Sequence, residues 1–355
     1  MVNYILVINP GSTSTKFAIF EDEKPILKKV IYHSAQALGS YESIMLQSDA
    51  RKRLIINSIH ESEFDSKKLT CVCGRGGLLR PLVGGTYKIN EKMLDDLKSS
   101  KYGSHASNLG AIIAHEIASY LNIPAYTVDP VSIDELEDIA RISGMPLIER
   151  TSIFHALNHK AIARHVASDK GKKYDEMNLI IAHLGGGISV AAHHKGRVID
   201  VNGALDGDGP MSPERSGSVP IGPLTKLCFS NKYTLDEVIK MNHGEGGLVG
   251  YLNSNNAKEI VERINNGDKY AKLIYDAMIY QTAKEIGAYA TVLKGQIDYI
   301  ALTGGLAYEE YFIKHLKERI SFLAEILVYP GEDELLSLAL GALRVQRNVE
   351  QSKDY

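Results

Sequence analysis

Short apolar runs separated by polar turns open the chain. Tyr4–Ile8 ends at Asn9-Pro10-Gly11-Ser12, Lys16–Phe20 follows, and Ile26–Tyr32 comes after a charged turn. Runs of this length joined by such short turns are typical of antiparallel hairpins. The pattern therefore predicts three consecutive antiparallel strands, with a Gly/Ser turn between the first and the second.

The same pattern returns in the middle of the chain. Leu179–Ala182 leads into His183-Leu184-Gly185-Gly186-Gly187, Ile188–Ala192 follows, and Arg197–Val201 comes after another short polar turn. Both copies place a turn rich in small residues between their first two strands. A repeat this long is not the period of a solenoid. It predicts an internal duplication, with two similar domains.

After each copy the apolar spacing becomes helical and then returns to short buried runs. Strands combined with packed helices predict an α/β protein with mixed sheets and flanking helices. The predicted helices are Asn108–Leu121, Asp268–Lys294 and Leu335–Val345, and the predicted buried strands are Pro124–Val128 and Tyr299–Thr303.

The length of 355 residues fits two domains. We expect one domain to comprise residues 1–130 plus 336–355 and the other to comprise residues 131–335. The most apolar helix, Leu335–Val345, is about half as long as a membrane-spanning helix needs to be. We therefore expect no membrane partner.

Charge and cysteine content narrow the function classes further. A net charge of −3 gives no support for a nucleic-acid or anionic-membrane binder. The chain has 3 cysteines, which is no basis for a disulfide framework and fits a reducing compartment. We expect a cytoplasmic protein that acts on a small molecule.

Gly-rich turns at strand ends provide the candidate chemistry. Glycine lets backbone N–H groups approach phosphate oxygens, and Ser12, Ser14 and Lys16 add hydroxyl donors and a positive charge. A single such turn is more often an ordinary hairpin. Three of them, with Gly185–Gly187 and Gly304-Gly305, favour a nucleotide. Neither a Walker nor a Rossmann motif is present.

These turns resemble those of a known family. The segment Asn9–Phe17 is similar to the N-x-G-S-x-S-x-K-[FY] opening of the acetate and butyrate kinases, and His183–Ser189 is similar to their second phosphate loop. Arg150, Ile153–Asn158 and Pro213–Gly217 extend the match over essentially the whole chain. The butyrate kinases fit best. The resemblance implies duplicated actin-like (ribonuclease H-like) domains with ATP in the interdomain cleft. It also implies transfer of a phosphoryl group from ATP to butyrate, which gives butanoyl phosphate and ADP.

The resemblance also assigns catalytic residues. A carboxylate acceptor is already ionised at neutral pH, so the enzyme must supply cations rather than a base. Arg75 and Arg215 match the family arginines that flank the transferred group. His155 and His183 are expected to donate hydrogen bonds to the phosphoryl oxygens, and Asp129 is the matching acidic residue near the metal and phosphates. By contrast, Arg51, Arg53 and Arg319 are interpreted as surface arginines in loops, and Arg80 is left open.

Magnesium and the nucleotide complete the implied site. Mg²⁺ takes few protein carboxylates in such sites, and Glu334 with Asn9 is expected near it. Glu332 is the rival, because the local register could slip by two residues. Lys16 has an alternative role as a bridge across the first strand pair. The residues expected to contact the nucleotide are Asn9, Ser12, Ser14, Lys16, His183, Gly185, Gly186, Gly187, Gly304, Gly305 and Leu306.

Small residues near the acyl group suggest a preference for longer acids. The predicted substrate pocket consists of Gly77, Ser104, His105 and Phe154, and Asp206 aligns with a proline of the acetate kinase pocket. Two more buried methylenes are worth roughly 1.6 kcal/mol. Four-carbon acids, straight or branched, are therefore expected to be used better than acetate, and Gly77→Val is expected to reverse this preference.

Other functions compete with this one. Acetate, propionate or isobutyrate could replace butyrate. A sugar kinase would need an aspartate base for a hydroxyl acceptor. An ATP-driven binding protein of the actin or Hsp70 kind would need a further binding domain or a filament surface. His155 and His159 stand four apart, as zinc ligands do, but the H-E-x-x-H motif is absent. A homodimer or larger homo-oligomer is expected.

Overall fold

The structure, a computed structural model, describes residues 2–34, 36, 39, 41–205 and 207–355. Contacts divide the chain into two compact units. Unit 1 comprises Met1–Ile133 and Asp333–Tyr355, and unit 2 comprises Asp134–Glu332. These bounds differ by three residues from the expected ones, 130 and 336, at each change of unit.

A six-stranded sheet in the order β3-β2-β1-β4-β6-β5 forms the centre of unit 1. The first three strands pair antiparallel, which confirms the predicted hairpins. Strands β4 and β6 continue the sheet parallel to β1, and β5 closes it antiparallel. The strands are β1 (Tyr4–Pro10), β2 (Ser14–Glu21), β3 (Lys24–Tyr32), β4 (Cys71–Gly74), β5 (Thr86–Lys88) and β6 (Ala125–Val128).

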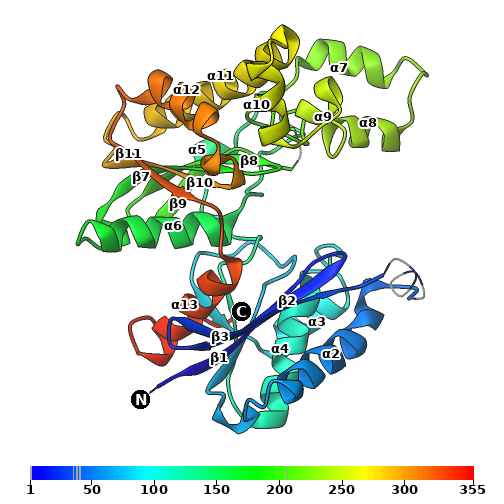
Figure 1. Cartoon of the computed structure of the whole chain (residues 1–355), viewed down its shortest axis with the longest axis vertical. Coiled ribbons are helices and arrows are strands. Elements are labelled where there is room, and N and C mark those ends of the chain that lie inside the picture. Colours follow the sequence, from blue (N-terminus) through cyan, green and yellow to red (C-terminus); the bar gives the residue numbers. More distant parts are fainter. Residues whose placement is uncertain (1, 35, 37–38, 40, 206) are drawn as a thin grey trace. The chain divides into compact units, whose positions relative to one another are not determined.

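Helices cover both faces of this sheet. The predicted helix Asn108–Leu121 is α4, which packs on β1, β4 and β6, and α2 and α3 pack against it. Helix α13 covers the other face (Figure 1). The helical segments are η1 (Ile44–Gln47), α2 (Ser48–Glu61), η2 (Ser66–Lys68), α3 (Glu91–Lys98), α4 (Asn108–Leu121) and α13 (Glu334–Gln346).

Unit 2 repeats this topology in a five-stranded sheet with the order β11-β10-β7-β8-β9. Strands β7, β8 and β9 pair antiparallel as β1, β2 and β3 do, and β10 and β11 run parallel to β7 as β4 and β6 do to β1. The predicted duplication is confirmed. The strands are β7 (Asn178–Leu184), β8 (Ile188–His194), β9 (Arg197–Val201), β10 (Tyr299–Gly304) and β11 (Ile326–Pro330).

Side chains of β7 alternate between two cores, one on each face of the sheet. Helices α11 and α6 lie on opposite faces of the sheet (Figure 1). Ile180 and Ala182 pack toward α11, while Leu179 and Ile181 pack toward α6. The sheet is therefore buried on both sides, as its continuous apolar runs predict. The helical segments are α5 (Asp138–Arg141), α6 (Ala156–Asp169), η3 (Tyr174–Glu176), α7 (Ile221–Cys228), α8 (Leu235–Asn242), α9 (Gly247–Leu252), α10 (Ala257–Asn265), α11 (Lys269–Val292), η4 (Gly305–Tyr308) and α12 (Glu310–Ile320).

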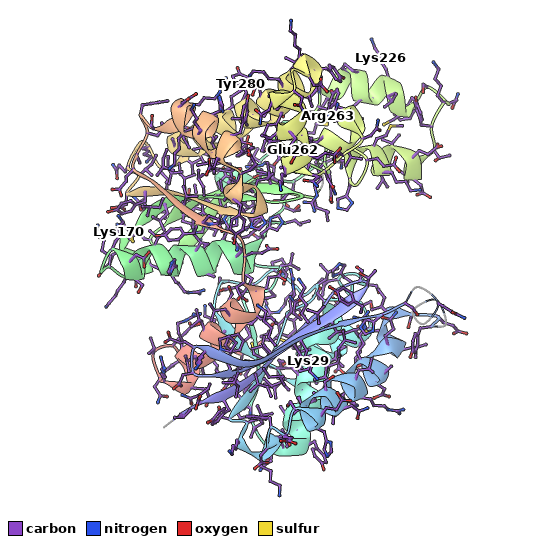
Figure 2. The ribbon with its side chains drawn as sticks, viewed as in Figure 1. Lys29, Lys170, Lys226, Glu262, Arg263 and Tyr280 are labelled. Carbon is purple, nitrogen blue, oxygen red and sulfur yellow. The ribbon has the colours of Figure 1, made fainter. Side chains whose placement is uncertain are left out.

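Tyrosines are spread around the long helix α11. Tyr275 and Tyr289 are buried, whereas Tyr270 and Tyr280 are exposed. Figure 2 shows Tyr280 on the surface of this helix, where the guanidinium of Arg319 lies 5.2 Å from the ring centroid. Among the described residues, no helix combines the length and the apolar character needed to cross a membrane.

Candidate active site

Three of the predicted site residues meet in unit 1. Asn9 is the next-to-last residue of β1, Arg75 follows the neighbouring strand β4, and Glu334 begins α13. The Asn9 amide nitrogen Nδ2 donates to Glu334 Oε2 at 2.6 Å, and Arg75 Nη1 donates to Glu334 Oε1 and, at 3.3 Å, to Asn9 Oδ1. Asp333 caps the helix by accepting from Leu336 N, which fixes where Glu334 emerges. The result is a polar cluster with one cation and one carboxylate at the ends of two central strands.

A close approach of two backbones holds Arg75 in place. A Cβ atom on Gly74 would lie 2.1 Å from the carbonyl oxygen of Gly110 in α4, and one on Gly110 would lie 2.4 Å from the carbonyl oxygen of Arg75. Because only glycine permits such contacts, helix α4 packs directly on the end of β4. The backbone N–H of Arg75 also donates to Ile8 O at 2.8 Å.

The first Gly/Ser turn presents side chains that a ligand can reach. The backbone N–H of Gly11 donates to Ser14 O at 2.7 Å and closes the turn. Ser12 and Lys16 are exposed and Ser14 is half-buried. His105 and Ser104 are exposed as well. Desolvation and then the positive charge of Arg75 lower the pKa of His105, which places this histidine in the electrostatic environment of the cluster.

Arg51 is not the surface arginine that the sequence predicts. It lies in α2 with 2% of its surface exposed, and its guanidinium donates to Gly11 O at 2.9 Å, Ser14 O at 3.2 Å and Thr15 Oγ1 at 3.0 Å. The turn is therefore held from inside by a buried cation. One signal was available: Arg51 stands four residues before Ile55 and eight before Ile59, on the apolar face of the helix. Arg53 and Arg319 are exposed, as expected, but they lie in helices α2 and α12 rather than in loops.

Asp129 is engaged with the backbone of a neighbouring turn. It is 1% exposed, its φ of +38° lies in the left-handed region, and its Oδ1 accepts from Gly85 N at 2.7 Å. These contacts indicate a structural role for Asp129, which holds the backbone that follows β6 against the turn at Gly85. The expected role of Asp129 near metal and phosphates remains a prediction.

The interpretation of Gly77 as the wall of an open pocket is wrong. A Cβ there would lie 2.5 Å from the Cα of Asn108, at the start of α4. Asn108 is fully buried, accepts from Leu78 N at 2.9 Å and donates to Gly103 O at 2.9 Å. Valine at position 77 would displace this helix start rather than narrow a substrate site. Asp206, the other position of this argument, lies outside the described residues.

In unit 2 the two predicted catalytic histidines stack on each other. The rings of His155 and His183 have centroids 3.9 Å apart and an interplanar angle of 19°. His183 is the next-to-last residue of β7 and is 3% exposed. Its Nδ1 lies 3.1 Å from Asn158 Oδ1, and its Nε2 lies 3.7 Å from Glu332 Oε2. Burial, followed by the positive charge of Arg215, lowers the pKa of His183 to about 4. This histidine is neutral near pH 7.

Arg215 lies directly on the second glycine turn. A Cβ on Gly187 would lie 2.1 Å from Arg215 Nη1, and one on Gly185 would lie 2.9 Å from His183 Nε2. The guanidinium also donates to the carbonyl oxygen of Ala204. The backbone N–H of Glu214 donates to Gly186 O at 3.1 Å, so the loop that carries Arg215 packs on this turn. The structure thus brings Arg215, His183 and Gly185–Gly187 together.

The third glycine turn lies beside the second. Gly304 has a φ of +91°, and a Cβ there would lie 2.5 Å from Leu184 O, so β10 approaches the end of β7 too closely for a side chain. A Cβ on Gly305, by contrast, would meet no atom of the other described residues within 4 Å. The side chain of Leu306 packs in the core with 6% exposure. The side chain of Leu306 is therefore not available to a ligand.

The two candidate glutamates separate clearly. Glu334 contacts Asn9 and Arg75 in unit 1, whereas Glu332 faces His183 in unit 2. Phe154, predicted as a wall of the substrate pocket, is 3% exposed, and its ring lies edge-on to His159 with centroids 5.2 Å apart. Phe154 therefore packs against the buried His159, and its role as a substrate contact remains a prediction.

Buried neutral histidines make the stability of this protein depend on pH. The pKa values of His159 and His193 are lowered well below 6.5, mainly by burial, and that of His183 to about 4. The unfolded chain takes up these protons more readily, so stability is complete above about pH 6.5 and is lost as the pH falls toward 4. At pH 5.5, His183 alone should lower the free energy of unfolding by about 1 kcal/mol relative to pH 7.5.

Urea unfolding at the two pH values measures this effect. The other two histidines add to the loss in the same direction. Replacement of the exposed His165 by Gln should leave the difference unchanged, while His193→Gln should reduce it. Equal stability of the wild type at pH 7.5 and 5.5 would contradict neutral burial.

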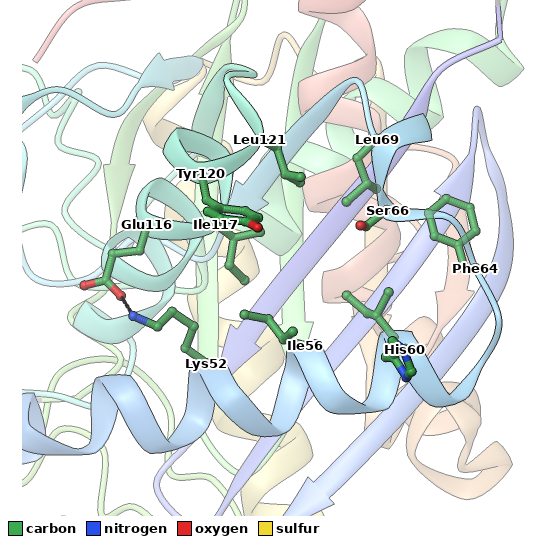
Figure 3. A pocket seen from close by; sticks show the side chains of 11 residues that line it. Lys52, Ile56, His60, Phe64, Ser66, Leu69, Glu116, Ile117, Tyr120 and Leu121 are labelled. Carbon is green, nitrogen blue, oxygen red and sulfur yellow. Dashed lines mark hydrogen bonds and ion pairs between the residues drawn. The ribbon is translucent and has the colours of Figure 1, made fainter.

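A separate apolar pocket of about 430 Å³ lies in unit 1. Figure 3 shows it between α2 and α4, with the Lys52–Glu116 ion pair of 2.7 Å on its rim. None of the predicted site residues lines it. It therefore takes no part in the candidate site.

Several known proteins are similar to this chain. Butyrate kinase 1 of Clostridium acetobutylicum is 55% identical over 351 residues, which cover 99% of this chain and 99% of that protein. The crystal structure of Porphyromonas gingivalis acetate kinase has a TM-score of 0.81 at 20% identity and covers 97% of this chain and 100% of that one.

A more distant likeness concerns the fold alone. A ROK family protein from Streptococcus pneumoniae, solved in complex with sucrose, has a TM-score of 0.54 at 12% identity and covers 98% of this chain and 100% of that one. This supports the duplicated actin-like α/β fold. The model of the Acetokinase family matches residues 147–323. With near-complete coverage at more than half identity to a butyrate kinase, the chain belongs to the acetokinase family.

Proposed function

We propose that this protein is a butyrate kinase, which transfers the γ-phosphoryl group of ATP to the carboxylate of butyrate and gives butanoyl phosphate and ADP. The observation that carries the proposal is 55% identity to Butyrate kinase 1 over 99% of both chains. The reaction is reversible, because an acyl phosphate can return its phosphoryl group to ADP.

Cations are what this chemistry needs most. An anionic acceptor must approach a polyanion, so positive groups aimed at the charge of the transition state lower the barrier. Arg75 in unit 1 and Arg215 in unit 2 supply two guanidinium groups, and His155 supplies a ring N–H donor. Ser12, Ser14, Lys16 and the backbone of Gly185–Gly187 are proposed to hold phosphate oxygens.

Magnesium is part of the proposal. The Asn9 amide group and the Glu334 carboxylate are neighbours joined by a hydrogen bond, and amide and carboxylate oxygens are ligands that suit this ion. Within the described residues, no group of three or more His, Cys, Asp or Glu side chains gathers as a metal cage. Such a sparse donor set fits an ion that takes most of its ligands from phosphates and water. When bound, the ion would neutralise phosphate charge.

Chain-length preference for four-carbon acids belongs to the same proposal. Two additional buried methylenes would favour butyrate over acetate by roughly 1.6 kcal/mol, or about tenfold to twentyfold in kcat/KM. Isobutyrate is the branched alternative. Ser104 and His105 remain the proposed contacts of the acyl group, with Arg75 beside His105. The cytoplasmic location and the homo-oligomer inferred from the sequence are also proposals, and sedimentation would test the latter.

Trapping of the acyl phosphate tests the function directly. The purified protein is incubated with ATP, Mg²⁺ and hydroxylamine, together with acetate, propionate, butyrate, isobutyrate or glucose. We expect most hydroxamate with butyrate and none without ATP. Acetate used as well as butyrate would contradict the chain-length preference alone. ADP formed with glucose and no hydroxamate with any acid would instead favour a sugar kinase.

A further inference from the structure

A chain of hydrogen bonds runs through the interior of unit 2 and ends at His155. The Tyr174 hydroxyl lies 2.7 Å from His193 Nδ1, and His193 Nε2 lies 3.3 Å from His159 Nδ1. His159 Nε2 lies 2.8 Å from Ser189 Oγ, which lies 2.9 Å from His155 Nδ1. Five side chains are thus connected in one sequence of donors and acceptors.

The secondary structure explains why these groups meet. Ser189 and His193 lie four apart on β8, so both point to the same face of the sheet. His155 and His159 lie four apart at the start of α6, so both lie on one side of this helix. Helix α6 packs on that face, and the two pairs therefore interleave. This is also why the spacing of His155 and His159 resembles a metal motif.

The three central side chains of this hydrogen-bonded sequence are buried and uncharged. Ser189, His159 and His193 are 0% exposed. Burial lowers the pKa of both histidines, and the positive charges of Lys160 and Arg164 lower that of His193 further. Each ring therefore carries one proton and offers one donor and one acceptor nitrogen. Because every link holds a single hydrogen, the direction of the first bond sets the direction of all the others.

The phenol end determines that direction. A phenol hydroxyl is a better donor than acceptor when it faces an imidazole nitrogen, and the ammonium group of Lys160, 5.5 Å from the Tyr174 ring centroid, strengthens it as a donor. If Tyr174 donates to His193 Nδ1, then His193 Nε2 donates to His159 and His159 Nε2 donates to Ser189. The Ser189 hydroxyl then donates to Nδ1 of His155. The proton of His155 must consequently sit on Nε2.

We propose that Tyr174, His193, His159 and Ser189 form a tautomer relay that keeps the proton of His155 on Nε2, the form in which this ring can donate a hydrogen bond to a phosphoryl oxygen. They are positioning residues, since they act through His155. The inference rests on the proposed function for the role of His155. The neighbouring His183 carries its proton on the other ring nitrogen, Nδ1, because this nitrogen faces the amide oxygen of Asn158, which can only accept a hydrogen bond.

Nitrogen NMR of the ligand-free, full-length protein tests the relay. In protein labelled with ¹⁵N-histidine, long-range ¹H–¹⁵N spectra at pH 7.5 show which ring nitrogen carries the proton, and His155→Asn assigns the signal. We expect the Nε2–H form of His155 in the wild type. Tyr174→Phe removes the donor that sets the direction, and should give a mixture of tautomers.

Kinetics provide a second readout. Tyr174→Phe should lower kcat roughly threefold to thirtyfold with KM for ATP unchanged, because the ring stays in place but donates only part of the time. Ser189→Ala, which removes the last link without adding volume, should do the same. The matched control is Tyr329→Phe. Tyr329 packs in the same core and donates to Asp169 at 2.9 Å, outside the relay, so neither readout should change.

The outcomes separate the relay from the enzyme activity. A wild-type His155 that is protonated on Nδ1, or a tautomer that stays fixed in both Tyr174→Phe and Ser189→Ala, would overturn the relay. These spectra need no substrate, so they test the tautomer of His155 even if the wild type makes no acyl hydroxamate. A failure of the proposed function would appear only in the trapping assay.

Discussion

Arg75→Ala and Arg215→Ala are each expected to lower kcat by roughly two to four decades, with little change in ATP binding. Each guanidinium stabilises the negative charge that develops in the transition state as the carboxylate attacks the phosphoryl group. Arg75 is held for this task by Glu334 and Asn9, and Arg215 by Ala204 O above Gly187. A coupled assay for ADP gives kcat and KM, and nucleotide titration by calorimetry gives the affinity.

Matched variants separate charge from packing. Arg53→Ala removes an exposed arginine of α2 and should leave turnover unchanged. Arg75→Lys keeps the charge but loses the planar fork, and should recover part of the lost rate. Turnover near that of the wild type in both alanine variants would falsify the proposed role of the two arginines. Loss of rate together with loss of folding, seen by circular dichroism, would call for Arg215→Lys as the second test.

Local patterns predicted the fold well. The meander β1–β3 and its copy β7–β9 follow from short apolar runs with polar turns between them, which is information contained within a few residues. Helix α4 spans the predicted residues Asn108–Leu121, and α13 extends the predicted Leu335–Val345 by one residue at each end. The spacing of apolar residues within each of these segments is enough to predict its secondary structure, without knowledge of contacts to distant residues.

The parts of the site that the sequence missed depend on distant partners. Whether Gly77 faces open space depends on Asn108, which lies 31 positions later at the start of another helix. The relay to His155 needs η3, α6 and β8 to pack together before its hydrogen bonds exist. The prediction that Arg51 lies on the surface is wrong for the same reason. The carbonyl groups that accept hydrogen bonds from its guanidinium belong to a turn some forty residues earlier. Residue type and spacing carry no record of such contacts.

Arg51→Met should destabilise unit 1 by about 3 kcal/mol or more, and should raise KM for ATP about tenfold. The guanidinium donates to Gly11 O and Ser14 O, and also to Thr15 Oγ1, inside the protein. Methionine fills much of the volume but donates no hydrogen bond. Ser14 O keeps its bond from Gly11 N, and each buried acceptor that is left unpaired costs about 1–3 kcal/mol.

The effect on ATP follows from the shape of the turn. Carbonyl groups held inward by Arg51 keep the backbone and the exposed Ser12 of the first turn in one arrangement, which is the preorganisation that a phosphate site requires. Urea unfolding measures the stability, and initial rates at varied ATP measure KM. Arg53→Met, two residues along the same helix but exposed, is the matched control and should change neither quantity. If Arg51→Met lost stability while KM for ATP stayed at the wild-type value, Arg51 would hold the fold of unit 1 and the first turn would not bind the nucleotide.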